Sequence, residues 1–185
     1  MNEAGPPLLV LGLGNDILGD DAVGLLAARR LAVDRPPAVE VVEAAGCGLD
    51  LLDHLVGRRQ ALLLDAIVTG QHPPGSVLEV GPENFLGDHT SPHAAGLPEA
   101  LSLARCLGLP LPEDLRILAL EIEDAYQVRE GLSPSVERAL PAYIQRARMI
   151  VEGWCQTSQP PPGWPHDPEK MESGPGKEME ERGAA

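Results

Sequence analysis

Acidic and imidazole side chains follow three apolar segments of this chain. Asp20 and Asp21 come shortly after the apolar run at residues 8–13. Asp65 ends a second apolar run, directly after three leucines, and His93 lies in a Ser-Pro-His segment just ahead of a predicted helix. In open α/β sheets, ligands bind outside the carboxyl ends of the strands, so these side chains are expected to meet at one edge.

Two carboxylates and an imidazole at one edge support two kinds of chemistry. Oxygen and nitrogen donors of this kind suit nickel, zinc or manganese. The same groups can equally act as general acid and base around a bound water. The residues alone leave both possibilities open.

Each of these residues also has a purely structural interpretation. Asp20 and Asp21 stand where acidic residues cap a helix. Asp65 is harder to explain in this way, because an ionised Asp is rarely buried without a partner, although a structural partner would suffice. His93 could be an exposed loop residue, like the neighbouring His89.

The pattern of apolar residues predicts strands alternating with helices. Strands are predicted at residues 8–11, 39–45, 60–68, 76–80 and 115–121, and helices at 22–33, 49–55, 94–107 and 133–154. This order predicts an α/β three-layer sandwich around a mostly parallel twisted sheet of about five strands, with helices on both faces. The strands at 60–68 and 76–80 are joined too briefly for a crossover and are predicted to form one antiparallel pair.

One domain is predicted at residues 1–156, followed by a disordered Pro/Gly/Glu-rich tail at 157–185 that contains too few apolar residues to form a core. The net charge of −14 argues against binding to nucleic acid or to an anionic membrane surface. No segment has the length of a transmembrane helix or the flanks of a signal peptide. The three widely spaced cysteines are typical of a reducing compartment, so a cytoplasmic location is expected.

The sequence offers two rival candidate sites, a nucleotide-binding loop and a cysteine nucleophile, and supports each of them less well. Gly12-Leu13-Gly14 is similar to the start of the dinucleotide fingerprint G-x-G-x-x-G, but Ile17 occupies the third glycine position. The two aspartates that follow would repel a pyrophosphate. Cys47, between two glycines, could be nucleophilic, but its sequence neighbours supply no base, which favours a turn residue.

Four segments resemble the motifs of the hydrogenase maturation proteases, in order and with matching spacing. They are Leu9-Val10-Leu11-Gly12-Leu13-Gly14-Asn15-Asp16-Ile17-Leu18-Gly19-Asp20-Asp21-Ala22-Val23-Gly24, then Leu64-Asp65-Ala66-Ile67-Val68, then Ser91-Pro92-His93 with Gly96-Leu97, and finally Gly131-Leu132-Ser133-Pro134. The similarity runs from about Leu8 to about Trp154.

The resemblance implies a cytoplasmic endopeptidase that removes the C-terminal extension of a nickel–iron hydrogenase large-subunit precursor after nickel insertion. It implies that Asp21, Asp65 and His93 contact nickel that is carried by the substrate rather than held by the free enzyme, and that they are also the catalytic residues. A monomer is expected. A chaperone-like protein that binds the nickel-loaded subunit without cutting it would need the same residues and is the alternative.

The chain departs from the family pattern in two places. Asp21 stands where some relatives have Glu, which shortens the arm that reaches the metal. The segment 43–48 reads Glu-Ala-Ala-Gly-Cys-Gly where relatives often have Asp-Gly-Gly, so the substrate cleft is expected to differ there.

Overall fold

Five strands form one sheet in the order β2-β1-β3-β5-β4. The computed structural model describes residues 8–82, 91, 93 and 95–157. The strands are β1 (Leu8–Leu13), β2 (Val39–Ala44), β3 (Gln60–Ile67), β4 (Val77–Val80) and β5 (Asp114–Glu121). All neighbours are parallel except β4 and β5, which are antiparallel.

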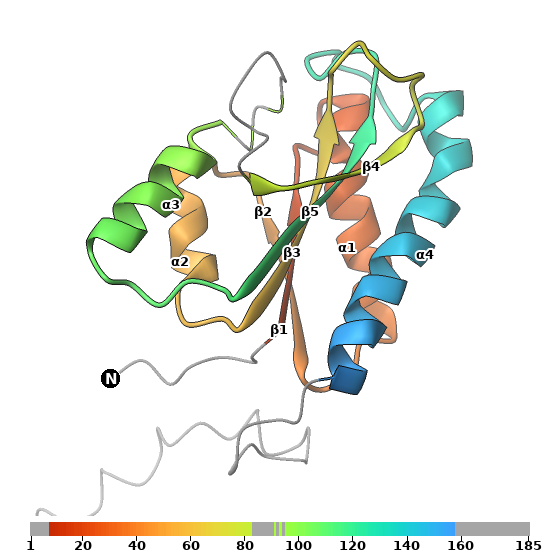
Figure 1. Ribbon diagram of the computed structural model, residues 1–185. Coiled ribbons are helices and arrows are strands. Elements are labelled where there is room, and N and C mark those ends of the chain that lie inside the picture. The colour runs from red at the N-terminus through yellow and green to blue at the C-terminus, as the bar shows by residue number, and fades with distance from the viewer. Residues whose placement is uncertain (1–7, 83–90, 92, 94, 158–185) are drawn as a thin grey trace, which may run out of the picture.

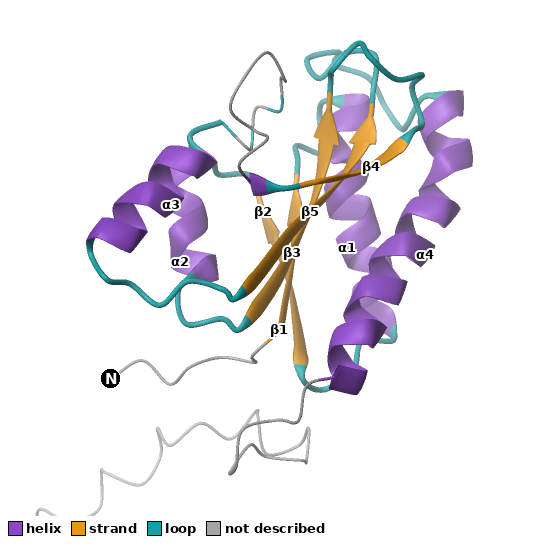
Figure 2. Ribbon diagram, in the orientation of Figure 1, coloured by secondary structure: helices purple, strands orange, loops and turns teal. Residues whose placement is uncertain are grey.

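Helices cover both faces of the sheet (Figure 1). Helices α1 (Val23–Val33) and α4 (Pro134–Thr157) lie on one face, whereas α2 (Leu52–Leu55) and α3 (Leu97–Cys106) lie on the other. Figure 2 shows the resulting three layers of helix, sheet and helix. The predicted fold class is therefore confirmed.

The central strand β3 divides two hydrophobic cores. Successive side chains of a strand point to opposite faces. Leu62 and Leu64 accordingly join the core under α1 and α4, and Ala61 and Leu63 join the core under α2 and α3. Because both faces are covered, the strand reads as a continuous apolar run, as expected for a central parallel strand.

The prediction of an antiparallel pair between the strands at 60–68 and 76–80 was wrong about the partner. β4 does run antiparallel to β3, but it pairs with β5, which lies between them. Residues 117–121 of β5 are buried and need neighbours on both sides, whereas β4 is only half-buried and exposes Glu79, as befits an edge strand. The loop 68–76 is long enough to pass over β5, and Gly75 donates its N–H to the Glu121 carbonyl.

Other boundaries differ slightly from the predictions. Helix α3 begins at Leu97 rather than at 94, because Gly96 has a left-handed backbone (φ 77°) that cannot continue a helix. Helix α4 includes Thr157, one residue beyond the predicted domain boundary. The predicted tail at 157–185, apart from Thr157, and most of the predicted loop at 81–92 lie outside the described residues.

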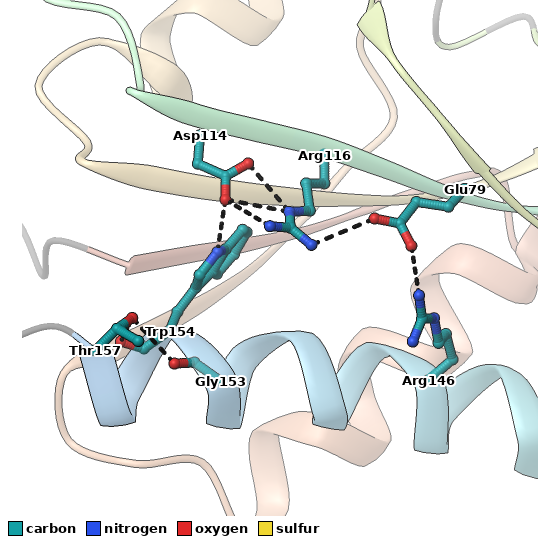
Figure 3. Close-up of polar contacts among 7 residues, drawn as sticks. All are labelled: Glu79, Asp114, Arg116, Arg146, Gly153, Trp154 and Thr157. Carbon is teal, nitrogen blue, oxygen red and sulfur yellow. Dashed lines mark hydrogen bonds and ion pairs between the residues drawn. The ribbon is translucent and has the colours of Figure 1, made fainter.

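A polar network fastens α4 to the amino-terminal half of β5 (Figure 3). Arg116 of β5 pairs with Asp114 at 2.9 Å and with Glu79 of β4 at 3.4 Å, and Glu79 also pairs with Arg146 of α4 at 2.7 Å. Trp154 of α4 donates its indole N–H to Asp114 at 2.8 Å. This network lies at the opposite end of the sheet from the carboxyl ends of the parallel strands.

Within the described residues, no helix is both long enough and apolar enough to span a bilayer.

Candidate functional site

The first acidic segment forms a 3-10 turn, η1 (Gly19–Ala22), between the carboxyl end of β1 and the start of α1. Asp21 in this turn is fully buried. Two glycines allow the close packing that buries it. A Cβ at Gly14 would lie 2.3 Å from the Asp21 carbonyl oxygen, and a Cβ at Gly24 would lie 2.3 Å from the carbonyl oxygens of both Leu13 and Leu64.

Asp65 is fully buried near the carboxyl end of β3, and the strand continues past it to Ile67. Its side chain has the same parity as Leu63 and therefore points to the face covered by α2 and α3. One carboxylate oxygen accepts the N–H of Ala66 at 2.8 Å. The other accepts a short hydrogen bond from the hydroxyl of Ser91.

His93 joins the two acidic segments. Its Nε2 lies 3.0 Å from Oδ2 of Asp21, and the backbone of Gly46, in the loop after β2, forms a further hydrogen bond with it. His93 also interacts electrostatically with Asp65. The structure thus brings the three predicted residues together at the carboxyl edge of the sheet, with Asp21 and His93 in direct contact.

The charges at this site depend on one another. Burial raises the pKa of the Asp65 carboxyl to about 6, although the Ser91 hydrogen bond and the His93 charge oppose the shift. The hydrogen bond to Asp21 raises the pKa of His93, and the charge on Asp65 acts in the same direction. Burial thus brings the pKa of Asp65 into a range in which its carboxyl can take up or release a proton during a reaction, and His93 beside it holds its proton more tightly than a free imidazole does.

The donor set fits a metal ion, but the described residues do not form a finished metal site. No group of three His, Cys, Asp or Glu side chains in residues 8–82, 91, 93 and 95–157 is arranged to hold a metal ion by itself. Oδ1 of Asp21, however, is buried and accepts no hydrogen bond from any described residue. A buried carboxylate oxygen is normally paired. This oxygen and the neighbouring imidazole are suitable ligands for a divalent transition metal that arrives from outside.

The capping interpretation of Asp20 and Asp21 is not supported, because neither side chain caps η1 or α1. Asp20 instead accepts the N–H of Ser133 at 2.5 Å and so fastens the start of α4 to the site. His93 is not an exposed loop residue, since only 7% of it is accessible. His89 lies outside the described residues.

Sequence reasoning missed three supporting groups. The Ser91 hydroxyl orients Asp65, a role that the Ser-Pro-His motif by itself does not indicate. Tyr143 of α4 is buried and donates its hydroxyl to the carbonyls of Leu118, at 2.7 Å, and of Asp65, at 3.2 Å. Glu121 is buried and accepts hydrogen bonds from Thr69 and Gly70. Tyr143 and Glu121 come from segments whose local sequence carries no signal of this role.

The rival sites have structural explanations. A Cβ at Gly12 would lie 2.5 Å from the Cβ of Ala28, so this glycine allows α1 to pack against β1. Gly14 accommodates the Asp21 carbonyl in the same way, which accounts for both glycines without a nucleotide. Cys47 is an exposed free thiol at the N-terminal end of the turn η2 (Gly48–Leu51).

Comparisons with known proteins agree on one family. A family model described as hydrogenase maturation protease matches residues 24–150, a span that includes Asp65 and His93 and starts three residues after Asp21. The hydrogenase 2 maturation protease of Escherichia coli is 29% identical over 144 residues, which are 75% of this chain and 87% of that protein. The hydrogenase expression/formation protein HupD of Bradyrhizobium diazoefficiens is 31% identical over 157 residues, covering 81% and 80%.

Solved structures give the same answer for the fold. The hydrogenase maturating endopeptidase HybD from E. coli superposes with a TM-score of 0.70 at 28% identity, covering 79% of this chain and 92% of that one. The [NiFe] hydrogenase maturation protease HybD from Thermococcus kodakarensis gives a TM-score of 0.63 at 24% identity, covering 78% and 98%, and supports the fold alone.

Proposed function

This chain belongs to the hydrogenase maturation protease family, and we propose that it is the endopeptidase that removes the C-terminal extension of a nickel–iron hydrogenase large-subunit precursor after nickel insertion. In this proposal the enzyme recognises the nickel that the precursor carries. Asp21, Asp65 and His93 contact that metal, which is part of the substrate, and also take part in the cleavage.

The unpaired Oδ1 of Asp21 is the observation that carries this proposal. Leaving a buried acceptor without a partner costs about 1–3 kcal/mol, and more when the acceptor is charged. The folded protein keeps this oxygen without a hydrogen bond from any described residue at the edge of the sheet, next to an imidazole and a second carboxylate. A substrate that brings a cation to this position removes the cost, whereas a metal-free precursor leaves it in place.

Such a difference is large enough to act as a test of substrate maturity. About 3 kcal/mol of extra binding free energy for the loaded precursor corresponds to a selectivity of roughly a hundredfold. Selection then needs no separate sensing domain, because the groups that cut are the groups that recognise the metal.

Proton transfer at the scissile bond is assigned to Asp65. Asp65, with a pKa raised to about 6 by burial, is able to accept a proton from an attacking water and to return it to the leaving amine. Ser91 keeps the Asp65 carboxylate in one orientation. Asp21 holds the His93 ring through Nε2, and the backbone of Gly46 forms a further hydrogen bond with His93.

We further propose that the protein acts as a monomer in the cytoplasm. Cys47, Cys106 and Cys155 are all free thiols, which supports a reducing compartment.

The decisive measurement is the intact mass of the hydrogenase large subunit, co-expressed with the metal-insertion machinery in the presence or absence of this chain. Loss of a C-terminal peptide only when nickel and this chain are both present is the expected result. An unchanged mass together with a stable complex would favour the alternative, in which the chain binds the subunit without cutting it. No cleavage and no complex would refute the proposal for that hydrogenase.

His93→Ala tests the site itself and is expected to lower processing by at least about a hundredfold, as loss of a general acid–base or metal-contacting group does. His72→Ala is the matched control, because His72 is exposed in the loop before β4. Full processing by a folded His93→Ala protein would remove His93 from the proposed machinery.

A further inference from the structure

Three large apolar side chains are exposed in the loops beside the candidate site. Ile17, in the loop after β1, is 66% exposed, and Tyr126 and Val128, in the loop between β5 and α4, are 67% and 72% exposed. Single exposed apolar residues are common on protein surfaces. A group of them next to a functional site is a marker of an interaction surface.

The two loops lie side by side. Leu18 forms a parallel bridge with Arg129, so the residues that precede them, Ile17 and Val128, are neighbours in register. The contact is close, because a Cβ at Gly19 would lie 2.3 Å from Cγ of Arg129. Tyr126 is two residues before Val128 in the same loop. We call Ile17, Tyr126 and Val128 the apolar rim.

Local hydrogen bonds hold the apolar rim in a fixed position relative to the site. The N–H of Asp21 donates to the carbonyl of Leu18 at 3.1 Å, and the N–H of Ile17 donates to the side chain of Asn15 at 3.0 Å. On the other loop, Tyr126 donates its N–H to the side chain of Asp124 at 2.8 Å. The loops lie at the upper end of the sheet in Figure 1, the end at which β1 and β3 finish.

Negative charge lies beside Tyr126 and Val128 of the apolar rim. Glu123, Asp124 and Glu130 are exposed in the same loop as Tyr126 and Val128. The loop's one arginine, Arg129, donates to the carbonyl of Leu132 at 3.1 Å and is only partly exposed. A partner that covers this surface therefore needs an apolar centre with basic side chains around it.

We infer that the apolar rim is the docking surface for the body of the folded large-subunit precursor, which meets it through an apolar patch flanked by Lys or Arg. The inference rests on the proposed function. On that proposal the metal reaches Asp21 together with the part of the precursor that binds it. That part of the precursor must therefore lie against the surface around Asp21. The apolar rim belongs to this surface, since its Ile17 is four residues before Asp21 in the sequence.

Two lysine substitutions with matched controls test this surface. Ile17→Lys and Val128→Lys place a positive charge opposite the basic partner. Leu107→Lys and Val33→Lys are their controls, because these side chains are 64% and 76% exposed at the far ends of α3 and α1. The quantities to measure are the apparent dissociation constant of purified nickel-loaded precursor and its cleavage rate at saturation.

We expect each rim variant to weaken precursor binding by about tenfold or more, as loss of a central contact in an interface does. The cleavage rate at saturating precursor should stay within about twofold, since the rim lies outside the reacting groups. Both controls should bind and cleave like the wild type. Binding by the wild type should weaken steeply as salt is raised.

Several outcomes would overturn the inference. Unchanged affinity in both rim variants, while wild type binds and cleaves, would exclude this surface but leave the proposed function intact. Equal losses in the Leu107 and Val33 controls would attribute the effect to charge alone. If wild-type protein neither binds nor cleaves the nickel-loaded precursor, the proposed function fails and the docking surface fails with it.

Discussion

Replacing Asp65 by Asn should make the protein more stable at alkaline pH while abolishing its processing activity. The carboxyl is fully buried, and burial raises its pKa from 3.8 to about 6. The folded state therefore keeps the proton to a higher pH than the unfolded state does. The free energy of unfolding falls as pH rises through this interval, because the charged form is penalised only in the folded protein.

The magnitude follows from the two pKa values. The rise from 3.8 to about 6 costs the wild-type protein about 3 kcal/mol at pH 8 and about half as much at pH 5. Asn is neutral at both pH values. It can still accept the Ala66 N–H through Oδ1 and donate its amide to Ser91, whose hydroxyl can turn to accept. The variant should therefore gain up to about 3 kcal/mol at pH 8, and the gain should fall to about half of that at pH 5.

Thermal unfolding followed by circular dichroism measures this directly. A domain of this size shifts by roughly 2–4 °C per kcal/mol, so Asp65→Asn should melt about 6–12 °C above wild type at pH 8 and about 3–6 °C above it at pH 5. Asp114→Asn is a control of opposite sign, because hydrogen bonds from Arg116 lower the pKa of Asp114. That carboxylate stabilises the fold above its unfolded pKa, and its loss should lower the melting temperature at pH 8.

Two results would refute this reasoning. A lower melting temperature for Asp65→Asn at pH 8 would mean that the carboxylate is paired in the folded protein well enough to offset its burial. A gain of the same size at pH 5 and pH 8 would mean that the effect arises from packing rather than from titration.

Two further substitutions test how the site is held in place. Gly24→Ala should lower the melting temperature by about 5–15 °C in differential scanning calorimetry, because the added Cβ would lie 2.3 Å from the carbonyl oxygens of Leu13 and Leu64. An unchanged melting temperature would mean that α1 can shift to make room for the methyl group. Tyr143→Phe removes a buried hydroxyl that donates to the carbonyls of Leu118 and Asp65. The free energy of unfolding measured in urea should fall by about 1–3 kcal/mol. A change near zero would show that these carbonyls need no such donor.

Local sequence was sufficient for most of the architecture. Apolar runs that are buried on both faces marked β1 and β3, and helical spacing marked α1 and α4, because these patterns reflect burial of each segment by itself. The rule that parallel strands place their carboxyl ends at one edge is enough to bring Asp21, Asp65 and His93 to one location. The family resemblance carried the same three residues and added the reaction.

Only the tertiary structure decided how strands and side chains were paired. Whether β4 lies beside β3 or beside β5 depends on which neighbour completes the sheet, and the short connection between β3 and β4 permits both. The roles of Tyr143 and Glu121 depend in the same way on contacts between residues about 50 to 80 positions apart in the chain. The contact of His93 with Asp21 and the unpaired oxygen of Asp21 likewise arise from packing of distant segments. Hydrogen bonds of this kind join groups that the chain brings together only on folding, so no spacing in the sequence encodes them.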